Sequence, residues 1–369
     1  NKGDPDEMKV NLGTINNKDN PSIYQTPYPP NVEEGIENRE QSLLYTVENF
    51  QDSTSFRSMK RFFGQGNDFM QYEEIQFFIR PDDELVAGVD AGMEFYLQIA
   101  YDSLQYYEIA IPLTERMANK WQWNNIRLSD LTNLKINAPS DGIFEEEITD
   151  SADPSRKYMA RLKGDPTLFR VKYLFAGIRN GTGRFIPFGS LWFNDIALGW
   201  VRKDVDHAER LSVSANFANI LSFNAGYQRT GAEFRSLKQK AGSGSLNESL
   251  AISGKTEINH IIPTLGFNLP MTVRYTRSMS TPKYLSQSDV EIVDQSISES
   301  QKTIRNAETY TFSMSRRNSK NLIMKHLFDN LKAGASYSRS NLASPTALDT
   351  AWSYNWNTNY QILFSKDRI

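Results

Sequence analysis

The chain has 369 residues, with 41 Lys and Arg against 44 Asp and Glu, so its formal net charge is only −3. This balance, without any basic block along the chain, argues against nucleic acid as a partner. The absence of cysteine excludes a disulfide framework, thiolate catalysis and cysteine-bound zinc, and no apolar run of about 18 residues predicts a transmembrane helix.

Residues 1–40 are rich in Asn, Asp, Glu and Pro and show no apolar period. We predict an extended polar lead-in or linker here. The chain opens on a polar stretch at Asn1 and stops at Ser365–Ile369, directly after a strongly patterned segment. We therefore expect it to be an internal fragment of a longer protein.

Residues 41–200 carry short runs in which every second residue is apolar, separated by turn residues such as Gly64 and Gly88. This pattern predicts antiparallel strands. The runs lie at 43–47, 75–79, 93–101, 107–113, 171–179 and 189–198. Ser129 or Asp130 is expected to cap one brief helical turn. Strands without a long helix predict an all-β domain, a β-sandwich of jelly-roll type.

The run at 189–198 is apolar on both sides, which predicts a central strand. Its alternation places Trp192, Asn194 and Ile196 on one face. Leu191, Phe193 and Ala197 fall on the other face. We expect Trp192 or Phe193 to be buried.

Residues 201–369 alternate over longer stretches, beginning with 211–227. That run is too long for one membrane-crossing strand of about 9 to 11 residues, so a tight turn is predicted at Ala218–Ile220. Further strands are expected at 250–258, 265–275, 310–314, 331–337 and 352–364. Pro270 must lie at an edge, a bulge or a strand start, and residues 280–307 form a long charged loop.

The polar positions of these later strands are mostly Ser, Asn, Thr and Gly rather than Lys and Glu. Such strands are typical of an outer-membrane β-barrel, and a second soluble sandwich is the alternative. In a barrel, Asn268, Thr272, Asn355 and Asn357 would face the lumen. Strand parity would turn the following residues toward lipid: Phe267, Leu269, Met271, Val273, Trp352, Tyr354, Trp356 and Tyr360.

No pattern of catalytic, cofactor-binding or metal-binding residues stands out, and we expect no enzyme. His207, His260 and His326 share no ligand spacing, and the cluster of Asp204, Asp206 and His207 is interpreted as a solvated turn. Glu73 and Glu74 would point to opposite faces of a strand.

Two further groups of side chains are candidates for a site. The run Glu145–Glu147 is interpreted as a solvated loop. Trp121, Trp123 and Trp192 could stack on sugar rings if exposed, although buried core aromatics are the more common case.

A resemblance to a known family is carried by LWFNDIAL at Leu191–Leu198 and YLFAGIRNGTG at Tyr173–Gly183. These resemble the EVWFNELRL strand and upstream GVEN turn of the SprA family, with Trp192, Phe193 and Asn194 on the motif strand. Asp195 and Ala197 stand where the family usually has Glu and Arg. Further collinear matches, over most of residues 10–345, are NREQSLLY at Asn38–Tyr45, YYEIAIPL at Tyr106–Leu113, KGDPTLFRVKYLFAG at Lys163–Gly177 and STPKY at Ser280–Tyr284.

The resemblance implies part of the outer-membrane translocon of the bacterial type IX secretion system, a pore that releases folded proteins at the cell surface and is linked to gliding motility in some bacteria. It implies membrane lipid, secreted cargo and other secretion-system subunits as partners, and no cofactor. The family's barrel is taken to be the largest known, with about 36 strands, so this chain alone would supply only part of it. The alternative is a carbohydrate-binding or partner-binding sandwich of a cell-surface protein.

Overall fold

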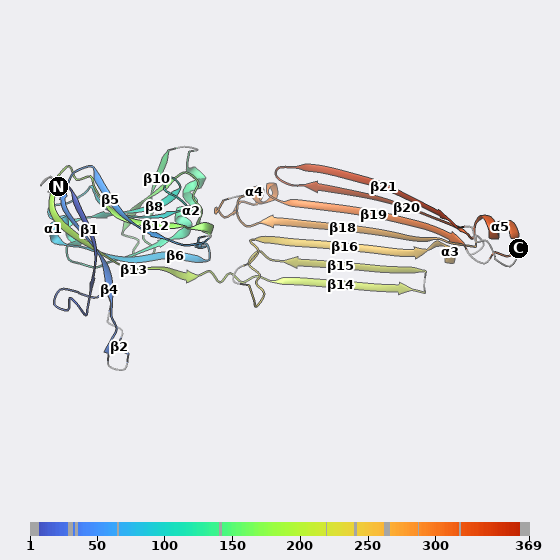
Figure 1. The fold of residues 1–369 in the computed structure, drawn as a ribbon, viewed down its shortest axis with the longest axis horizontal. Coiled ribbons are helices and arrows are strands. Elements are labelled where there is room, and N and C mark those ends of the chain that lie inside the picture. Colours follow the sequence, from blue (N-terminus) through green and yellow to red (C-terminus); the bar gives the residue numbers. More distant parts are fainter. Residues whose placement is uncertain are drawn as a thin grey trace, which may run out of the picture. The chain divides into compact units, whose positions relative to one another are not determined.

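The structure is a computed structural model of the 369-residue chain. It describes residues 7–28, 32–33, 36–64, 66–139, 142–218, 220–239, 242–261, 266–286, 288–316 and 319–361. The chain divides into two compact units (Figure 1). The first, here called the sandwich, comprises Asn1–Lys203 and Ser288–Val290, and the second comprises Asp204–Gln287 and Glu291–Ile369. The sequence predicts the boundary between them at residue 200.

The sandwich consists of two antiparallel sheets and a short hairpin of β2 (Val32–Glu33) and β3 (Ile36–Glu37). Sheet I has the order β1 (Lys9–Asn16), β4 (Gln41–Phe50), β13 (Ile186–Val201), β6 (Tyr72–Pro81) and β9 (Gln122–Arg127). Sheet II has the order β10 (Ile143–Thr149), β11 (Lys157–Lys163), β8 (Tyr106–Leu113), β7 (Met93–Ala100), β12 (Tyr173–Asn180) and β5 (Thr54–Arg61).

The strand order confirms the jelly-roll prediction. Sheet I contains the run β4-β13-β6-β9 and sheet II the run β5-β12-β7-β8. Among these eight strands, successive strands alternate between the sheets except for the hairpin of β7 and β8. This is the double Greek-key arrangement of eight strands. The strand β13 lies between β4 and β6, so its predicted central place is confirmed.

Aromatic residues hold the two sheets of the sandwich together. Phe77 of β6 and Phe193 of β13 pack on Phe95 of β7, with ring centroids 5.7 and 5.2 Å from that of Phe95. The hydroxyl of Tyr45 crosses from sheet I and donates to the Ala176 carbonyl of sheet II at 3.2 Å. Period-two alternation in both sheets thus builds one apolar layer between them.

Helices in the sandwich are few and short. They are α1 (Asp83–Val86), η1 (Glu115–Met117), α2 (Leu128–Asn137) and η2 (Leu168–Arg170). The helix α2 is longer than the predicted single turn, and its N-cap is Arg127 rather than Ser129 or Asp130, which both lie in its first turn.

Two predicted loops of the sandwich turn out to contain strands. Within the predicted polar lead-in, β1 pairs along its whole length with β4, from Lys9↔Glu48 to Asn16↔Gln41. The segment Glu145–Glu147 lies in β10 and pairs with β11. Neither strand has an apolar period, because only one or two of its side chains reach the interior. Each strand is instead held by backbone pairing with its neighbour.

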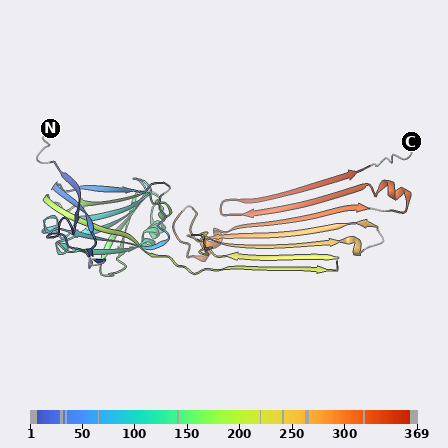
Figure 2. The same ribbon diagram turned by 60° about the horizontal axis from the view of Figure 1, so that its bottom comes forward.

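The second unit is one long antiparallel sheet, sheet III, which Figure 2 shows with its strands side by side. Its order is β14 (Ala208–Phe217), β15 (Leu221–Thr230), β16 (Ser245–Glu257), β18 (Pro270–Pro282), β19 (Thr303–Arg316), β20 (Leu331–Ala343) and β21 (Leu348–Tyr360), with β17 (Phe267–Asn268) beside β19. Among the described residues it is an open sheet with β14 and β21 at its edges.

Local predictions for this unit are mostly confirmed. Phe217 pairs with Leu221, and Ala218 and Ile220 lie in a turn between β14 and β15, as predicted. Pro270 is the first residue of β18, one of the three positions predicted for it.

The connections of sheet III differ more from the sequence predictions. The predicted strand 265–275 is divided into β17 and β18. The charged connection is shorter than 280–307, because β18 reaches Pro282 and β19 begins at Thr303. It contains α4 (Gln295–Ser300), and the other short helices of the unit are α3 (Ile258–Ile261) and α5 (Leu322–Leu327).

Candidate functional site

The side chains of sheet III separate onto two faces, and the strand register shows which residues share a face. Two residues that lie directly opposite each other on antiparallel strands have their side chains on the same face of the sheet. Paired residues can therefore be followed from strand to strand across the whole sheet. One such row is Ala215, Phe223, Gly254, Val273, Tyr310, Tyr337 and Tyr354. The next row is Phe217, Leu221, Thr256, Met271, Phe312, Ala335 and Trp356. Neither row contains a charge, and we call this side the apolar face.

Large aromatic side chains on this face are exposed. Trp356 is 82% exposed and Tyr354 is 68% exposed. The rings of Tyr310 and Tyr337 lie 6.1 Å apart, and those of Tyr337 and Tyr354 lie 4.9 Å apart, so they form a ladder across three strands. Soluble proteins rarely expose a contiguous apolar patch on this scale.

Charges return to the apolar face toward one end of the sheet, where α4 is labelled in Figure 1. Glu308 and Arg339 are paired across β19 and β20 in the row beyond the tyrosine ladder. Two rows further on, Arg229 is paired with both Glu209 and Glu248. The ladder therefore lies between an uncharged band and a charged rim, as aromatic girdles do at a membrane interface.

The opposite face is polar and mostly uncharged. A row on it contains Asn216, Ser222, Lys255, Thr272, Thr311, Ser336 and Asn355. The hydroxyls of Ser338 and Ser353 in the adjacent row are 2.8 Å apart. We call this side the polar face.

The residues predicted to face lipid mostly fall together on the apolar face. Met271, Val273, Tyr354 and Trp356 are in the two rows described above, and Trp352 and Tyr360 follow on β21 with the same parity. Phe267 pairs with Arg316, two positions beyond Met314 on the same side of β19. Leu269 lies between β17 and β18, outside any strand, so the register gives it no face.

The polar face likewise brings together the residues predicted to face a lumen. Thr272 and Asn355 lie in one row. Asn357 pairs with Gly334, and Asn268 pairs with Ser315, both on this side. Contact with lipid or with a lumen remains a prediction.

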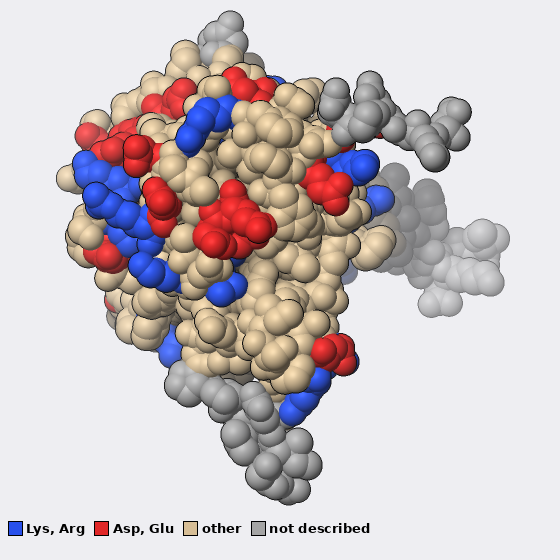
Figure 3. Space-filling view, turned by 90° about the vertical axis from the view of Figure 1, so that its left-hand side faces the viewer, with Lys and Arg blue, Asp and Glu red and all other residues tan. Residues whose placement is uncertain are grey.

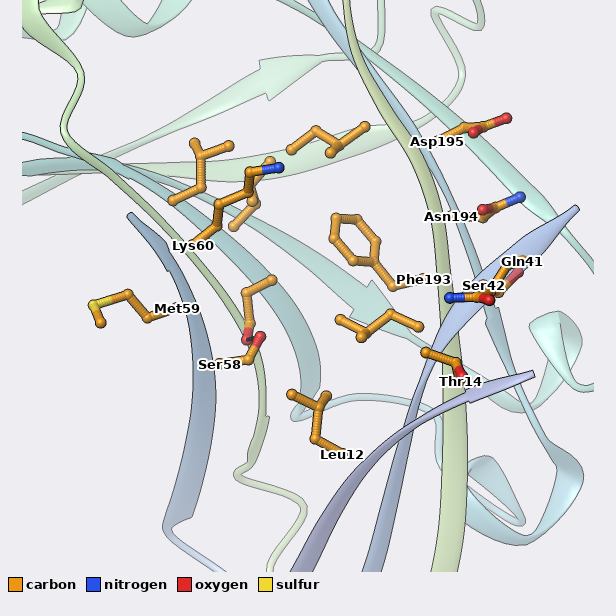
Figure 4. Close-up of a pocket in the computed structure, with 15 residues that line it drawn as sticks. Leu12, Thr14, Gln41, Ser42, Ser58, Met59, Lys60, Phe193, Asn194 and Asp195 are labelled. Carbon is orange, nitrogen blue, oxygen red and sulfur yellow. Dashed lines mark hydrogen bonds between the residues drawn. The ribbon is translucent and has the colours of Figure 1, made fainter. Parts of the chain in front are cut away.

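A second candidate site is a cavity of about 510 Å³ in the sandwich, between the edge strands β1 and β5 (Figure 4). Leu12 and Met59 lie at its edges, and the ring of Phe193 points into it. The remaining lining residues are Thr14, Gln41, Ser42, Leu43, Ser58, Lys60, Leu97, Leu174, Ala176, Asn194, Asp195 and Ile196. A pocket of this size, lined by eight apolar and seven polar residues, suits a binding site.

Three polar lining residues, Ser42, Ser58 and Asn194, are hydrogen-bonded to neighbouring side chains. Asn194 donates to Glu40 at 3.0 Å, and the Tyr24 hydroxyl lies 2.9 Å from that of Ser42. The Tyr45 hydroxyl lies 2.5 Å from the Ser58 hydroxyl, and burial raises the pKa of Tyr45 to about 12. These contacts hold the polar side chains in fixed positions around the apolar part of the cavity, as in a binding site.

A bulge on the motif strand shapes this cavity. The register between β13 and β6 shifts between Asn194 and Ala197, and Asp195 has φ +48°. The bulge overturns the predicted face of Ala197, which pairs with Gln76 and therefore lies on the side of Asn194, the partner of Phe78, instead of the side of Phe193. Ile196, within the bulge, lines the cavity. A non-glycine residue at positive φ is uncommon, and the Tyr28 hydroxyl donates to the Asp195 carboxylate.

The tryptophans considered for sugar binding are only partly available. Trp192 is 5% exposed because Tyr24 stacks on it at 5.5 Å and the Arg80 guanidinium lies 4.3 Å from its ring centre. Its predicted burial is confirmed. Trp121 packs on Trp192 at 5.9 Å and donates to the Gln25 carbonyl. Trp123 is 42% exposed and stacks on Phe78.

An ionic network on the outer face of sheet II was not expected from the sequence. Arg161 donates to Glu94, Glu108 and Glu145, each at 2.9 Å, and Arg179 also bonds Glu94 and Glu108. Burial acts to raise the pKa of Glu94, but the two arginines outweigh it and hold that pKa below its usual value. The signal was present, since Glu94 and Glu108 fall on the polar parity of runs 93–101 and 107–113.

Charge of both signs is also mixed on the surface. Figure 3 shows Lys and Arg interspersed with Asp and Glu on the face it presents. Such mixing fits the near-neutral composition.

Another titratable cluster is formed around Asp206 and His207. His207 Nε2 lies 3.0 Å from Glu209, and the Asp206 carboxylate accepts the Glu233 amide at 2.9 Å. His260 and His326 have side chains outside the described part. No group of three or more His, Asp or Glu that could hold a metal ion occurs within the described ranges. In that same part of the chain, no helix is both long and apolar enough to cross a membrane.

The chain was also compared with known proteins. The family model SprA_N, described as motility related/secretion protein, matches residues 2–296, well over half of the chain. None of the curated proteins matches.

Proposed function

Because the chain belongs to the SprA_N family of motility related/secretion proteins, we propose that it is part of the outer-membrane, protein-conducting translocon of the type IX secretion system. In this role it helps export folded proteins to the bacterial cell surface, which links it to gliding motility in some bacteria. Its partners are outer-membrane lipid, the secreted cargo and other subunits of the secretion system. The proposal assigns no catalytic step and no cofactor to this chain.

The observation that carries the proposal is the division of sheet III into an apolar and a polar face. In the outer membrane, strands alternate between side chains that meet lipid and side chains that meet an aqueous interior. The uncharged aromatic residues on β21 extend from Trp352 to Tyr360, which is close to the roughly 9 to 11 residues of a membrane-crossing strand. The tyrosine ladder supplies the interfacial girdle.

The polar face offers a surface along which a polypeptide can move. Serine, threonine and asparagine side chains form hydrogen bonds that are individually weak, since a typical net contribution is about 1 kcal/mol. Conduction requires that contacts with the cargo form easily and also break easily. A face dominated by such groups, with few charges, meets both requirements.

Photo-cross-linking in the native membrane tests the proposal. A photo-reactive phenylalanine analogue is placed at Ser336 on the polar face and, as the matched control, at the adjacent Ala335 on the apolar face. We expect adducts with secreted polypeptide from position 336 and adducts with lipid from position 335. Equal polypeptide adducts from both positions would contradict the proposal.

The cavity in the sandwich favours a second candidate function, binding of an apolar segment of a partner protein. Eight of its fifteen lining residues are apolar, and among the tryptophans considered for sugar stacking none lines it, so a partner suits it better than a carbohydrate. The exposed rim residue Leu12 allows a simple test. Leu12→Trp should fill the entrance and reduce the fluorescence of a bound anilinonaphthalene dye, whereas Ile23→Trp, at an exposed position away from the cavity lining, should leave it unchanged.

A further inference from the structure

A three-residue segment from the connection after β18 belongs to the sandwich and supplies its most deeply buried carboxylate. The segment is Ser288–Val290. Asp289 is 0% exposed, and Val290 beside it is also buried. An ionised carboxylate in such a place is costly unless donors surround it, so the groups that contact it define a site.

Four contacts converge on the Asp289 side chain. The Tyr107 hydroxyl lies 2.9 and 3.0 Å from its two oxygens. The Leu168 amide donates to it at 2.7 Å, and Lys135 Nζ lies 2.9 Å from Oδ1. These donors come from β8, η2 and α2, and none of them is near Asp289 in the sequence.

The donors are held in place by contacts that do not involve Asp289. Lys135 Nζ also lies 2.7 Å from Asp165, whose side chain is mostly exposed. Tyr107 is paired within sheet II to Ile99 and Leu162. Thr167 caps η2, where Leu168 is the first residue. Burial, followed by the neighbouring Asp289, raises the pKa of Tyr107 well above its usual value, so its hydroxyl stays a neutral donor.

We propose that Tyr107, Lys135 and the Leu168 amide form a preorganised carboxylate socket in the sandwich, and that Ser288–Val290 is an exchangeable strap that occupies it. The ligand class is an acidic peptide in which the Asp is followed by an apolar residue, as Asp289 is followed by Val290. Removal of the Asp289 side chain leaves a site that a small carboxylate or a free peptide of this sequence binds.

Chemical rescue tests the socket in the full chain. Asp289→Ala should lower the melting temperature of the sandwich by about 10 °C, because one partner of a buried ion pair is lost. Sodium acetate should restore part of that loss, and sodium chloride at the same ionic strength should not. The matched control is Asp165→Ala, which removes the exposed partner of Lys135 but leaves the socket filled, so acetate and chloride should act on it alike.

A peptide titration then tests the strap. A synthetic peptide of residues 286–292 should bind the Asp289→Ala chain at least about tenfold more tightly than the same peptide with Asn in place of Asp, since a charge-assisted contact is lost. If the variant is folded by circular dichroism and neither acetate nor the carboxylate of the peptide has a specific effect, the socket does not exist.

A second set of variants covers the case in which Asp289→Ala does not fold. Asp289→Asn and Lys135→Met are measured separately and together in the full chain. A socket predicts that the melting losses are coupled, with the double variant less affected than the sum. Additive losses would overturn the proposal.

Discussion

The sandwich and sheet III are built from the same period-two alternation, yet they use it in opposite ways. In the sandwich the apolar sides of two sheets meet, and side chains such as Phe77, Phe95 and Ile109 are fully buried. Among the described strand residues of sheet III, none is buried. Alternation therefore specifies that one face is apolar, but not what covers that face.

The chemistry of the other face tells the two regions apart. On the outer face of sheet II the polar positions are charged and joined into a network around Arg161. On the polar face of sheet III they are mostly Ser, Thr and Asn. We infer that the first face neutralises its charges by pairing them, whereas the second is adapted to a confined aqueous interior with lipid on the side opposite to it.

The largest effect is expected where the sandwich buries a ring. Trp192→Ala should destabilise the sandwich by about 3 to 5 kcal/mol, because a large buried side chain is replaced by a cavity. Guanidinium unfolding followed by near-ultraviolet circular dichroism measures it. The matched control, Trp356→Ala, removes an exposed ring of sheet III and should leave this transition unchanged. A loss below about 1 kcal/mol for Trp192→Ala would place that ring on an accessible surface.

A charge on the apolar face of sheet III should have the next largest effect. Met271→Arg should cost about 2 to 4 kcal/mol in phospholipid vesicles if the residue lies near the bilayer midplane. The adjacent control, Thr272→Arg, points to the polar face and should be tolerated. The measurement is a denaturant titration of each variant in the same vesicles. Equal costs would mean that the two faces do not differ in environment.

The ionic network of the sandwich should respond to pH. Glu94→Gln should cost about 1 to 3 kcal/mol at neutral pH, since hydrogen bonds to charged partners are lost. The folded-state pKa of Glu94 lies below its usual value of 4.5, so its contribution is present above pH 4.5 and is lost as the pH falls through the folded pKa.

Urea unfolding measures the free energy of unfolding of wild type and of Glu94→Gln at neutral and at acidic pH. We expect the two free energies to differ at neutral pH and to converge in acid. The control is Glu145→Gln, whose exposed carboxylate also bonds Arg161 and should matter by less than about 1 kcal/mol. If the difference in unfolding free energy between wild type and Glu94→Gln persists unchanged in acid, the lowered pKa of Glu94 in the folded state is refuted.

The smallest expected difference in stability is between the loss of one hydroxyl in the sandwich and the loss of one hydroxyl in sheet III. Tyr45→Phe removes the buried hydroxyl that contacts both the Ser58 hydroxyl and the Ala176 carbonyl and should cost about 1 kcal/mol. Ser338→Ala removes the exposed bond to Ser353 and should change stability by less than about 0.5 kcal/mol. Denaturant midpoints measure both, and the reverse order would mean that the Ser338 hydroxyl is shielded from water.

Sequence patterning was sufficient where an element determines its own structure. The alternation of residues 211–227, broken at 218–220, predicted β14, its turn and β15. The rule for proline in strands limited Pro270 to an edge, a bulge or a strand start, and the structure has the strand start. It was insufficient where the structure comes from a partner. The strand β1 exists because β4 pairs with it, and its own residues have no apolar period.

The candidate sites follow the same division. Strand parity alone grouped Met271, Val273, Tyr354 and Trp356 on one face, and the register agrees. The bulge at Asp195 was not predictable, because no glycine marks its positive φ, and it changes which residues line the cavity. Asp289 lay in a charged connection, and only the tertiary fold brings Tyr107 and Lys135 to it.

The central claim is that the apolar face of sheet III meets lipid while the polar face meets water. Nitroxide spin labels at Met271 and Thr272, in the full chain reconstituted into phospholipid vesicles, test this most directly. We predict that the label at 271 is relaxed mainly by oxygen dissolved in the membrane, and the label at 272 mainly by a water-soluble nickel complex. Equal water accessibility at the two positions, or the reverse order, would contradict the account.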